Sequence, residues 1–312
     1  MNLVFIGTPE FAVPILKAIL DSSHKVSLVV TQPDKANVRG NKIRYSPVKE
    51  MALSLGLPLA QYERISKNVA EIASLQPDIM LTAGYGQILS KELIAMPKYG
   101  IINVHGSLLP KYRGASPVQS ALLNGEQVIG VTIMNTLFEL DAGEIILQKE
   151  LALKGDENAG ECLQALSYIG AELAVVALDL IEQGKAIYKK QDESLATFCK
   201  PIKKEQGQLD FFNSALSEVN KIRAFTPNPS AFIHTKLGRI KVLASKAVPD
   251  KGNVNAGTII KAGAKEGLTI KCAQDAIALL KVQPEGSKAM DIADFMRGKG
   301  SAFSVGELIV NG

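Results

Sequence analysis

The chain has 312 residues, of which 46% are hydrophobic and 21% are charged, a balance typical of a globular protein long enough for two domains. No apolar run approaches the roughly 18 residues that span a bilayer, so neither a membrane protein nor a membrane partner is expected. The first residues lack a basic leader and indicate a strand rather than a signal peptide. Three widely spaced cysteines fit neither a disulfide framework nor a zinc site, and we expect a bacterial cytoplasmic protein.

The net charge of +4 is unevenly distributed along the chain. Residues 206–312 contain 14 Lys and Arg against 9 Asp and Glu, so the positive excess lies in the last third. A basic segment behind a near-neutral one indicates an anionic partner, with nucleic acid the first candidate. Ordinary solubilising charge explains the same excess, and composition leaves both explanations open.

The first 189 residues alternate short apolar runs with helical patterns. Thr8-Pro9-Glu10 has the residue types of an N-cap, a first-position proline and a first-turn acid, which predicts a helix from there to about Leu20. Further helices are predicted to begin at Ser46-Pro47, Ser116-Pro117 and Ala159. The predicted strands are Asn2–Ile6, Val26–Thr31, Asp78–Ala83, Gly100–Val104, Val128–Asn135 and Glu144–Glu150. The alternation predicts an α/β, Rossmann-like domain over residues 1–189, with a mostly parallel sheet and helices on both faces.

A polar stretch, Gln32–Tyr45, interrupts this alternation and is predicted to be a loop. Four of its fourteen residues are basic, namely Lys35, Arg39, Lys42 and Arg44.

Residues 190–208 are polar and carry little structural signal, which indicates a linker. A second domain is predicted over residues 209–312, beginning with a short helix at Ser214–Phe225. Its predicted strands are Ala231–Thr235, Arg239–Ala244, Gly257–Lys261, Leu268–Cys272 and Ala276–Val282. Five short strands with one helical turn near Met290–Met296 predict a small OB-like β-barrel.

Common cofactor motifs are missing from the sequence. Gly7 is the only glycine of a G-x-G-x-x-G pattern after the first strand, so NAD binding is poorly supported. No G-x-x-x-x-G-K-S/T loop occurs, and no His and Cys cluster has metal-ligand spacing.

The most informative stretch is residues 101–114, IINVHGSLLPKYRG. Asn103 and His105 lie two residues apart on a predicted strand, so both side chains point to one face at the strand's carboxyl end, where open α/β sheets bind ligands. Asp141 follows a later strand and turn and is expected to bring a carboxylate to the same rim. Together the three suit acyl transfer, because Asp favours the charged imidazole while His and Asn donate to a developing oxyanion. Packing and surface roles explain each residue singly, and the residues alone leave that choice open.

This pattern resembles the tetrahydrofolate-dependent formyltransferases, which carry an Asn-x-His pair, then Ser-Leu-Leu-Pro-x-x-Arg-Gly, then Asp-x-Gly. Here these are Asn103 and His105, Ser107–Gly114 and Asp141–Gly143. The resemblance implies 10-formyltetrahydrofolate as cosubstrate, no metal, and a catalytic role for Asn103, His105 and Asp141. The residues implied to bind the folate are Ser107, Leu108, Leu109 and Pro110.

Further matches extend the resemblance over essentially the whole chain, toward those family members that formylate a charged initiator tRNA. They are Gly7–Ala12, Thr31–Asp34, Arg39-Gly40, Ser46–Lys49, Arg223–Phe225 with Pro227 and Pro229, and Gln283–Gly286 with Lys288 and Met290. The resemblance implies that the basic loop wedges into the tRNA acceptor end through Arg39, Lys42 and Arg44, and that the barrel binds tRNA. A monomer is expected. Tyr112 departs from the pattern, because Trp is common there.

Four alternatives remain at this point. A sugar-nucleotide N-formyltransferase shares the catalytic triplet and the folate donor but does not require the basic insertion Gln32–Lys49. A glycinamide ribonucleotide formyltransferase is normally a single domain, against which residues 206–312 argue. A formyl-tetrahydrofolate hydrolase would leave the tRNA-type appendages without a role, and a non-catalytic RNA-binding module would not need an intact catalytic set.

Overall fold

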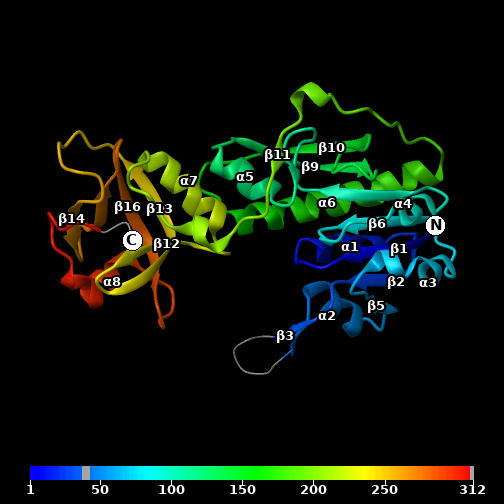
Figure 1. Ribbon diagram of the computed structural model, residues 1–312, viewed down its shortest axis with the longest axis horizontal. Helices are drawn as coiled ribbons and strands as arrows, with labels where there is room; N and C mark the ends of the chain where they lie inside the picture. Colours follow the sequence, from blue (N-terminus) through cyan, green and yellow to red (C-terminus); the bar gives the residue numbers. More distant parts are fainter. Residues whose placement is uncertain (37–42, 310–312) are drawn as a thin grey trace. The chain divides into compact units, whose positions relative to one another are not determined.

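The computed structural model describes residues 1–36 and 43–309, which divide into two compact units (Figure 1). Unit 1 comprises Met1–Pro117, Val128–Ala152 and Leu163–Lys200. Unit 2 comprises Val118–Gln127, Leu153–Cys162 and Pro201–Gly312. The sequence-based boundaries, with a first domain ending at 189 and a second starting at 209, remain a prediction.

Seven strands form the sheet of unit 1, in the order β10-β9-β7-β6-β1-β2-β5. Their bounds are β1 (Asn2–Gly7), β2 (Lys25–Thr31), β5 (Leu59–Gln61), β6 (Ile79–Ala83), β7 (Ile101–His105), β9 (Val128–Asn135) and β10 (Ile145–Ala152). Neighbours from β5 to β7 pair in parallel, whereas β9 runs antiparallel to both β7 and β10. The predicted mostly parallel α/β sheet is confirmed.

The helices of unit 1 cover both faces of this sheet. They are α1 (Ala12–Leu20), α2 (Pro47–Ser54), α3 (Val69–Ala73), α4 (Lys91–Ala95) and most of α6 (Ala159–Glu182), with single 3-10 turns η1 (Ile65–Lys67) and η2 (Glu193–Leu195). Val4 and Ile6 of β1 pack in one cluster with buried residues of α3 and α4. On the opposite face, Gly170 of α6 approaches Val104 of β7 so closely that an added Cβ would lie 2.8 Å from its Cγ1.

Within residues 1–36 and 43–309, α6 is the one helix long and apolar enough by composition to cross a membrane. Half of its most apolar window is buried inside the protein. Ala174, Ala177 and Leu178 are fully buried, which is typical of a helix that covers a sheet.

The prediction for the start of α1 is wrong by one turn. The helix begins at Ala12, and the Thr8 hydroxyl accepts the amide of Gln32 instead of capping it. The prediction at α2 is confirmed, because the Ser46 hydroxyl accepts the amide of Lys49 and Pro47 is the first helical residue. Both starts have a hydroxyl residue followed by proline, but Gln32, which comes directly after β2, engages the Thr8 hydroxyl.

Two short strand pairs lie in segments for which the sequence predicted loop or linker. One pair, β3 (Lys35–Ala36) and β4 (Ile43–Arg44), is antiparallel and lies within the predicted basic loop. The other pairs β8 (Arg113–Gly114) in parallel with β11 (Phe198–Cys199). The second pair ties the segment after residue 190 to the last two residues of the 101–114 motif.

Unit 2 is built on an antiparallel sheet in the order β12-β13-β16-β15-β14, with β17 added to β16. Its elements are α5 (Pro117–Leu123, from Val118 on), η3 (Lys204–Gly207), α7 (Ala215–Phe225), β12 (Ala231–Thr235), β13 (Gly238–Val248), β14 (Ile259–Gly263), β15 (Gly267–Lys271), β16 (Ala276–Pro284), β17 (Met290–Asp291), α8 (Ile292–Arg297) and η4 (Lys299–Ala302). Each of the five predicted strands overlaps an observed one, so the predicted C-terminal β-domain is confirmed. Alternate residues of these strands, such as Ile240 and Val242, are buried in one core with Phe211 and Phe295.

Candidate active site

The candidate site lies at the carboxyl end of β7, where Asn103 and His105 share a face of the sheet with Thr82 of β6. The Thr82 hydroxyl donates to Asn103 Oδ1 at 2.8 Å. This bond orients the carboxamide, and Nδ2 has no hydrogen-bond partner among the described residues. The half-buried Asn103 therefore offers an oriented N–H donor at the end of the strand.

His105 is 6% exposed and both of its ring nitrogens face polar groups. Nε2 lies 3.0 Å from the carbonyl oxygen of Tyr112. Because a carbonyl can only accept, Nε2 carries a proton. Nδ1 lies 3.7 Å from Asp141 Oδ2, which is within ion-pair range but too long for a hydrogen bond. A neutral imidazole in this orientation presents its lone pair at Nδ1.

Asp141 is held in an uncommon backbone conformation beside this histidine. Its φ is +47°, in the left-handed region that non-glycine residues rarely adopt. Its Oδ2 accepts the amide of Gly114 at 2.7 Å. An added Cβ on Gly143 would lie 1.6 Å from the carbonyl oxygen of Asn135, so only glycine fits there. The structure thus brings the predicted Asp-x-Gly segment to the same rim as His105.

A buried arginine next to the site is bound by residues that the sequence placed in a linker. Arg113 is 2% exposed, and its guanidinium donates to both carboxylate oxygens of Glu193 at 2.7 and 2.9 Å. Its Nε and Nη2 donate to Gln191 Oε1 at 3.1 and 2.8 Å. The hydrogen bonds from Arg113 hold the pKa of Glu193 below its usual range, although burial opposes this. Nothing in the polar composition of residues 190–208 signals Gln191 or Glu193, since their partners are about 80 residues away.

The predicted folate-binding segment, Ser107–Pro110, forms a turn held from β9 and β10. The Ser107 hydroxyl donates to the carbonyl of Lys111 at 2.6 Å, and the Thr132 hydroxyl donates to the carbonyl of Ser107 at 2.6 Å. Gln148 Nε2 donates to the carbonyl of Leu109 at 2.8 Å. Ser107 and Leu109 are almost fully buried. The Ser107 hydroxyl is already engaged within this turn, and folate binding by these residues remains a prediction.

One of the three predicted tRNA-binding residues is described by the structure. Arg44 is exposed at the end of β4, whereas Arg39 and Lys42 lie outside the described residues. The base of this insertion is anchored by Lys49 of α2, whose Nζ contacts Asp34 Oδ2 at 2.5 Å. That hydrogen bond is the main reason that the pKa of Asp34 lies below its usual range.

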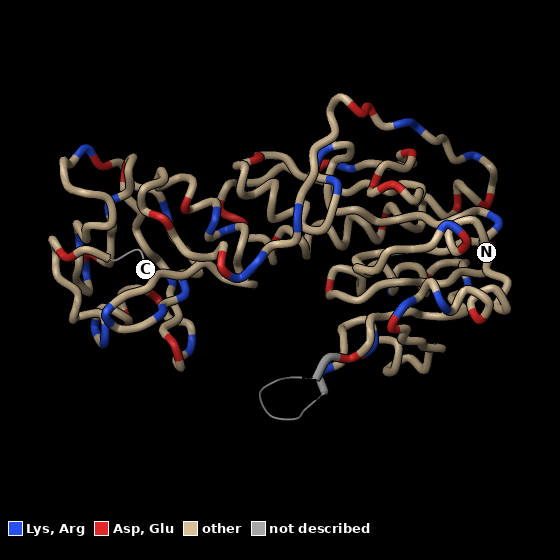
Figure 2. The backbone as a smooth tube through the Cα atoms, viewed as in Figure 1, with Lys and Arg blue, Asp and Glu red and all other residues tan. Residues whose placement is uncertain are grey.

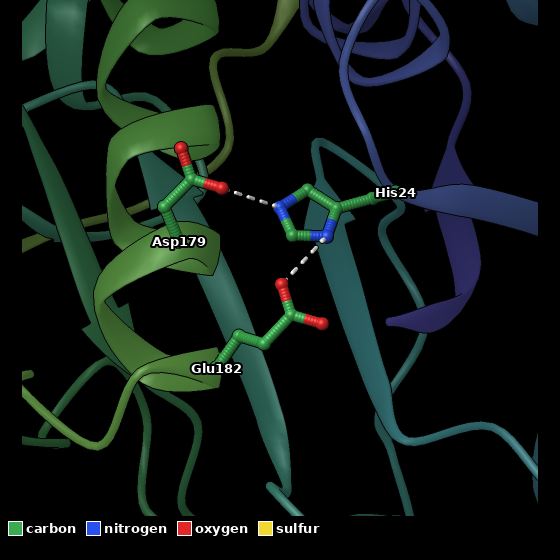
Figure 3. Close-up of side chains that lie close together, drawn as sticks. All are labelled: His24, Asp179 and Glu182. Carbon is green, nitrogen blue, oxygen red and sulfur yellow. Dashed lines mark hydrogen bonds and ion pairs between the residues drawn. The ribbon is translucent and has the colours of Figure 1, made fainter.

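A second titratable cluster joins His24 to two carboxylates of α6 (Figure 3). Nε2 lies 3.1 Å from Asp179 Oδ1, and Nδ1 lies 3.8 Å from Glu182 Oε2. The two carboxylates face different ring nitrogens, whereas ligands of one metal ion converge on a single point. The arrangement is that of an ion-pair cluster that packs the start of β2 against α6.

Residues 1–178 match a family model described as formyl transferase, and residues 201–300 match one described as formyl transferase, C-terminal domain. A methionyl-tRNA formyltransferase of a Sulfurihydrogenibium species is 42% identical over 301 residues, covering 96% of this chain and 97% of the relative. A methionyl-tRNA formyltransferase of Caldanaerobacter subterraneus subsp. tengcongensis is 39% identical over 301 residues, with the same coverage of both chains.

Solved structures share the fold at lower identity. An N-formyltransferase of Helicobacter canadensis in complex with folinic acid and dTDP-3-aminofucose has a TM-score of 0.68 at 20% identity, covering 89% of this chain and 98% of that one. HypX of Aquifex aeolicus in complex with tetrahydrofolic acid has a TM-score of 0.66 at 15% identity, covering 97% of this chain and 48% of that one. At these identities the similarity establishes the fold alone.

Proposed function

This chain belongs to the formyltransferase family, and from that premise we propose that it transfers a formyl group from 10-formyltetrahydrofolate to the α-amino group of methionyl initiator tRNA. The observation that carries the proposal is the 39–42% identity with methionyl-tRNA formyltransferases over nearly the full length of both chains. The geometry around Asn103, His105 and Asp141 supports the chemistry of the transfer. The product is N-formylmethionyl-tRNA, which serves translation initiation in the bacterial cytoplasm.

The first step is attack of the neutral amine on the formyl carbon. An α-amino group with a pKa of about 7.7–8.0 is partly neutral at pH 7, so a strong base is unnecessary. As the new C–N bond forms, the carbonyl electron pair moves to oxygen and creates an oxyanion. Asn103 Nδ2, oriented through the Thr82 bond to Oδ1, is the donor assigned to this oxyanion. One preorganised donor of this kind contributes about 2.7–4 kcal/mol to the transition state.

The second step moves the amine proton to the leaving nitrogen. His105 Nε2 is engaged with the Tyr112 carbonyl, so Nδ1 is the nitrogen assigned to accept this proton. The resulting imidazolium faces Asp141 Oδ2 at 3.7 Å, which stabilises its charge. The proton then passes to N10 of the folate as the C–N10 bond breaks, and the oxyanion collapses to the new amide. Protons and electron pairs balance with no covalent enzyme intermediate.

The tRNA contacts are assigned to the basic insertion and to unit 2. Arg44 is exposed at the described edge of the insertion, and Arg39 and Lys42 share the same segment. On unit 2, Lys and Arg occur along the strands and their turns (Figure 2), and Lys246, Lys261 and Lys281 are exposed. Cationic side chains that neutralise phosphates make affinity fall with salt, so tRNA binding is expected to weaken as ionic strength rises.

A formyl-transfer assay with three acceptors tests this function. Full-length protein and 10-formyltetrahydrofolate are incubated with methionyl initiator tRNA, methionyl elongator tRNA or an amino-sugar nucleotide. We expect rapid formylation of the initiator tRNA alone. Formylation of the sugar nucleotide instead would support the sugar N-formyltransferase function that two of the structural neighbours carry in their names. No transfer to any acceptor would overturn the proposal.

A further inference from the structure

We propose that Gln191 is a positioning residue that holds residues Asp141–Gly143, the Asp141 loop, in place beside His105. This inference rests on the proposed function, because it concerns the same reaction. The two N–H groups of Gln191 Nε2 donate to the backbone carbonyls of Asp141 at 2.8 Å and Gly143 at 2.7 Å. Its Oε1 accepts from Nε and Nη2 of Arg113 at 3.1 and 2.8 Å. One carboxamide therefore uses both of its donors and both of its acceptor lone pairs.

These bonds close a ring around the candidate catalytic pair. From His105 Nε2 the ring passes to the Tyr112 carbonyl and along the chain to Arg113, then through Gln191 to Asp141. Asp141 Oδ2 completes it by accepting the amide of Gly114 and by facing His105 Nδ1. Displacement of Gln191 would break the hydrogen bond to the Asp141 carbonyl and free Asp141 to move away from His105.

The Asp141 loop needs such an external support. Asp141 adopts a positive φ, a conformation that persists only where the surroundings impose it. The carbonyls of Asp141 and Gly143 receive no other hydrogen bond among the residues that the structure describes. Because the gap between Asp141 and His105 is already 3.7 Å, a further shift of the loop would weaken their interaction.

Glu193 offers a matched control for this role. It binds the same guanidinium as Gln191, with two bonds of 2.7 and 2.9 Å, but among the described residues it makes no hydrogen bond to Asp141, Ala142 or Gly143. The Glu193 side chain is 69% exposed, and Arg113 is its buried partner. When Glu193 is replaced, Arg113 still has its hydrogen bonds to Gln191. If Gln191 served only as a hydrogen-bond acceptor for Arg113, replacing Gln191 or Glu193 would have a similar effect on kcat. If Gln191 also positions Asp141, its replacement lowers kcat and that of Glu193 does not.

The test compares Q191E, Q191M and E193Q in the full-length protein, using 10-formyltetrahydrofolate and methionyl initiator tRNA. Q191E keeps an acceptor for Arg113 but places an oxygen against two carbonyl oxygens, and Q191M keeps only the volume. We expect both to lower kcat by about 10–100-fold with KM changed less than about threefold, because a displacement near 1 Å costs on this order. E193Q is expected to stay within about twofold of the parent, and melting temperatures verify folding.

A double-mutant cycle with D141N separates positioning from general stabilisation. If Gln191 acts through Asp141, then D141N/Q191M has the kcat of D141N within about twofold, because the loop no longer carries the charge to be positioned. If the decrease in kcat of D141N/Q191M equals the product of the decreases of the two single variants, the inference is overturned. Parent-level kcat in Q191E and Q191M would overturn it as well. Parent protein that transfers no formyl group to any acceptor would instead overturn the proposed function, so the two failures are distinguishable.

Discussion

The Nε2 atom of His105 lies 3.0 Å from the carbonyl oxygen of Tyr112, which leaves Nδ1 as the ring nitrogen that faces Asp141. Tyr112 has a φ of +61°, and its amide donates to the hydroxyl of Thr197 at 2.8 Å. The carbonyl that orients the imidazole is therefore fixed by the segment after residue 190. This segment supports both sides of the candidate catalytic pair, through Thr197 on one side and Gln191 on the other.

Replacement of Asn103 by Ala is expected to lower kcat for formyl transfer by about 10²–10³-fold, because the oriented Nδ2 donor to the oxyanion is lost. Thr82→Val keeps Asn103 but frees its carboxamide to rotate, and a smaller loss of about tenfold is expected. Single-turnover rates at saturating folate and tRNA measure the effect. An Asn103→Ala variant with the parent rate would remove Asn103 from the chemical step.

Gly143→Ala is expected to destabilise the protein by at least about 3 kcal/mol, because the added Cβ would lie 1.6 Å from the Asn135 carbonyl oxygen. Gly56→Ala is the matched control. Gly56 has a φ of +64° with nothing within 4 Å of an added Cβ, so only the backbone cost of about 1–2 kcal/mol applies. Urea unfolding monitored by circular dichroism compares the two. Equal losses would show that close packing at Gly143 is not the cause.

Asp179→Asn and Glu182→Gln are each expected to destabilise the protein, because Asp179 Oδ1 lies 3.1 Å from His24 Nε2 and Glu182 Oε1 lies 3.0 Å from the amino-terminal nitrogen. Both carboxylates are nearly half exposed, so each loss should stay below about 1 kcal/mol and shrink in 1 M salt. Thermal denaturation of the parent and of both variants measures these losses.

The same experiment on the parent protein tests for a bound cation. Its melting temperature is expected to be the same with EDTA, with added Zn²⁺ and with neither, and a rise with Zn²⁺ would show that His24 ligates a cation.

The Asp34–Lys49 pair predicts a stability difference that depends on pH. The hydrogen bond from Lys49 holds the pKa of Asp34 below its usual range, so the ionised carboxylate stabilises the folded state above the unfolded pKa of about 3.9. This contribution is lost as the pH falls through the folded pKa. Asp34→Asn should therefore cost about 1 kcal/mol at pH 7 and progressively less below about pH 4. Urea unfolding at pH 7 and pH 3 gives both values, and an equal cost at both would exclude the charge of Asp34 as the cause.

The sequence by itself determined the alternation of strands and helices and singled out the candidate catalytic residues. The observed β9 (Val128–Asn135) and β12 (Ala231–Thr235) have the predicted bounds, because the apolar run and the breaking residues at its ends are local signals. The placement of Asn103 and His105 on one face follows in the same way from the two-residue period of a strand.

Only the tertiary structure decided which groups support that pair. Gln191 and Thr197 reach the site from a polar segment about 50–85 residues away from their partners, and no local pattern encodes such a pairing. The start of α1 differs from the prediction for the same reason, since Gln32 of a neighbouring segment occupies the Thr8 hydroxyl. Local periodicity specifies elements because it acts between adjacent residues, whereas the contacts that orient Asp141 and His105 exist only after distant segments have packed together.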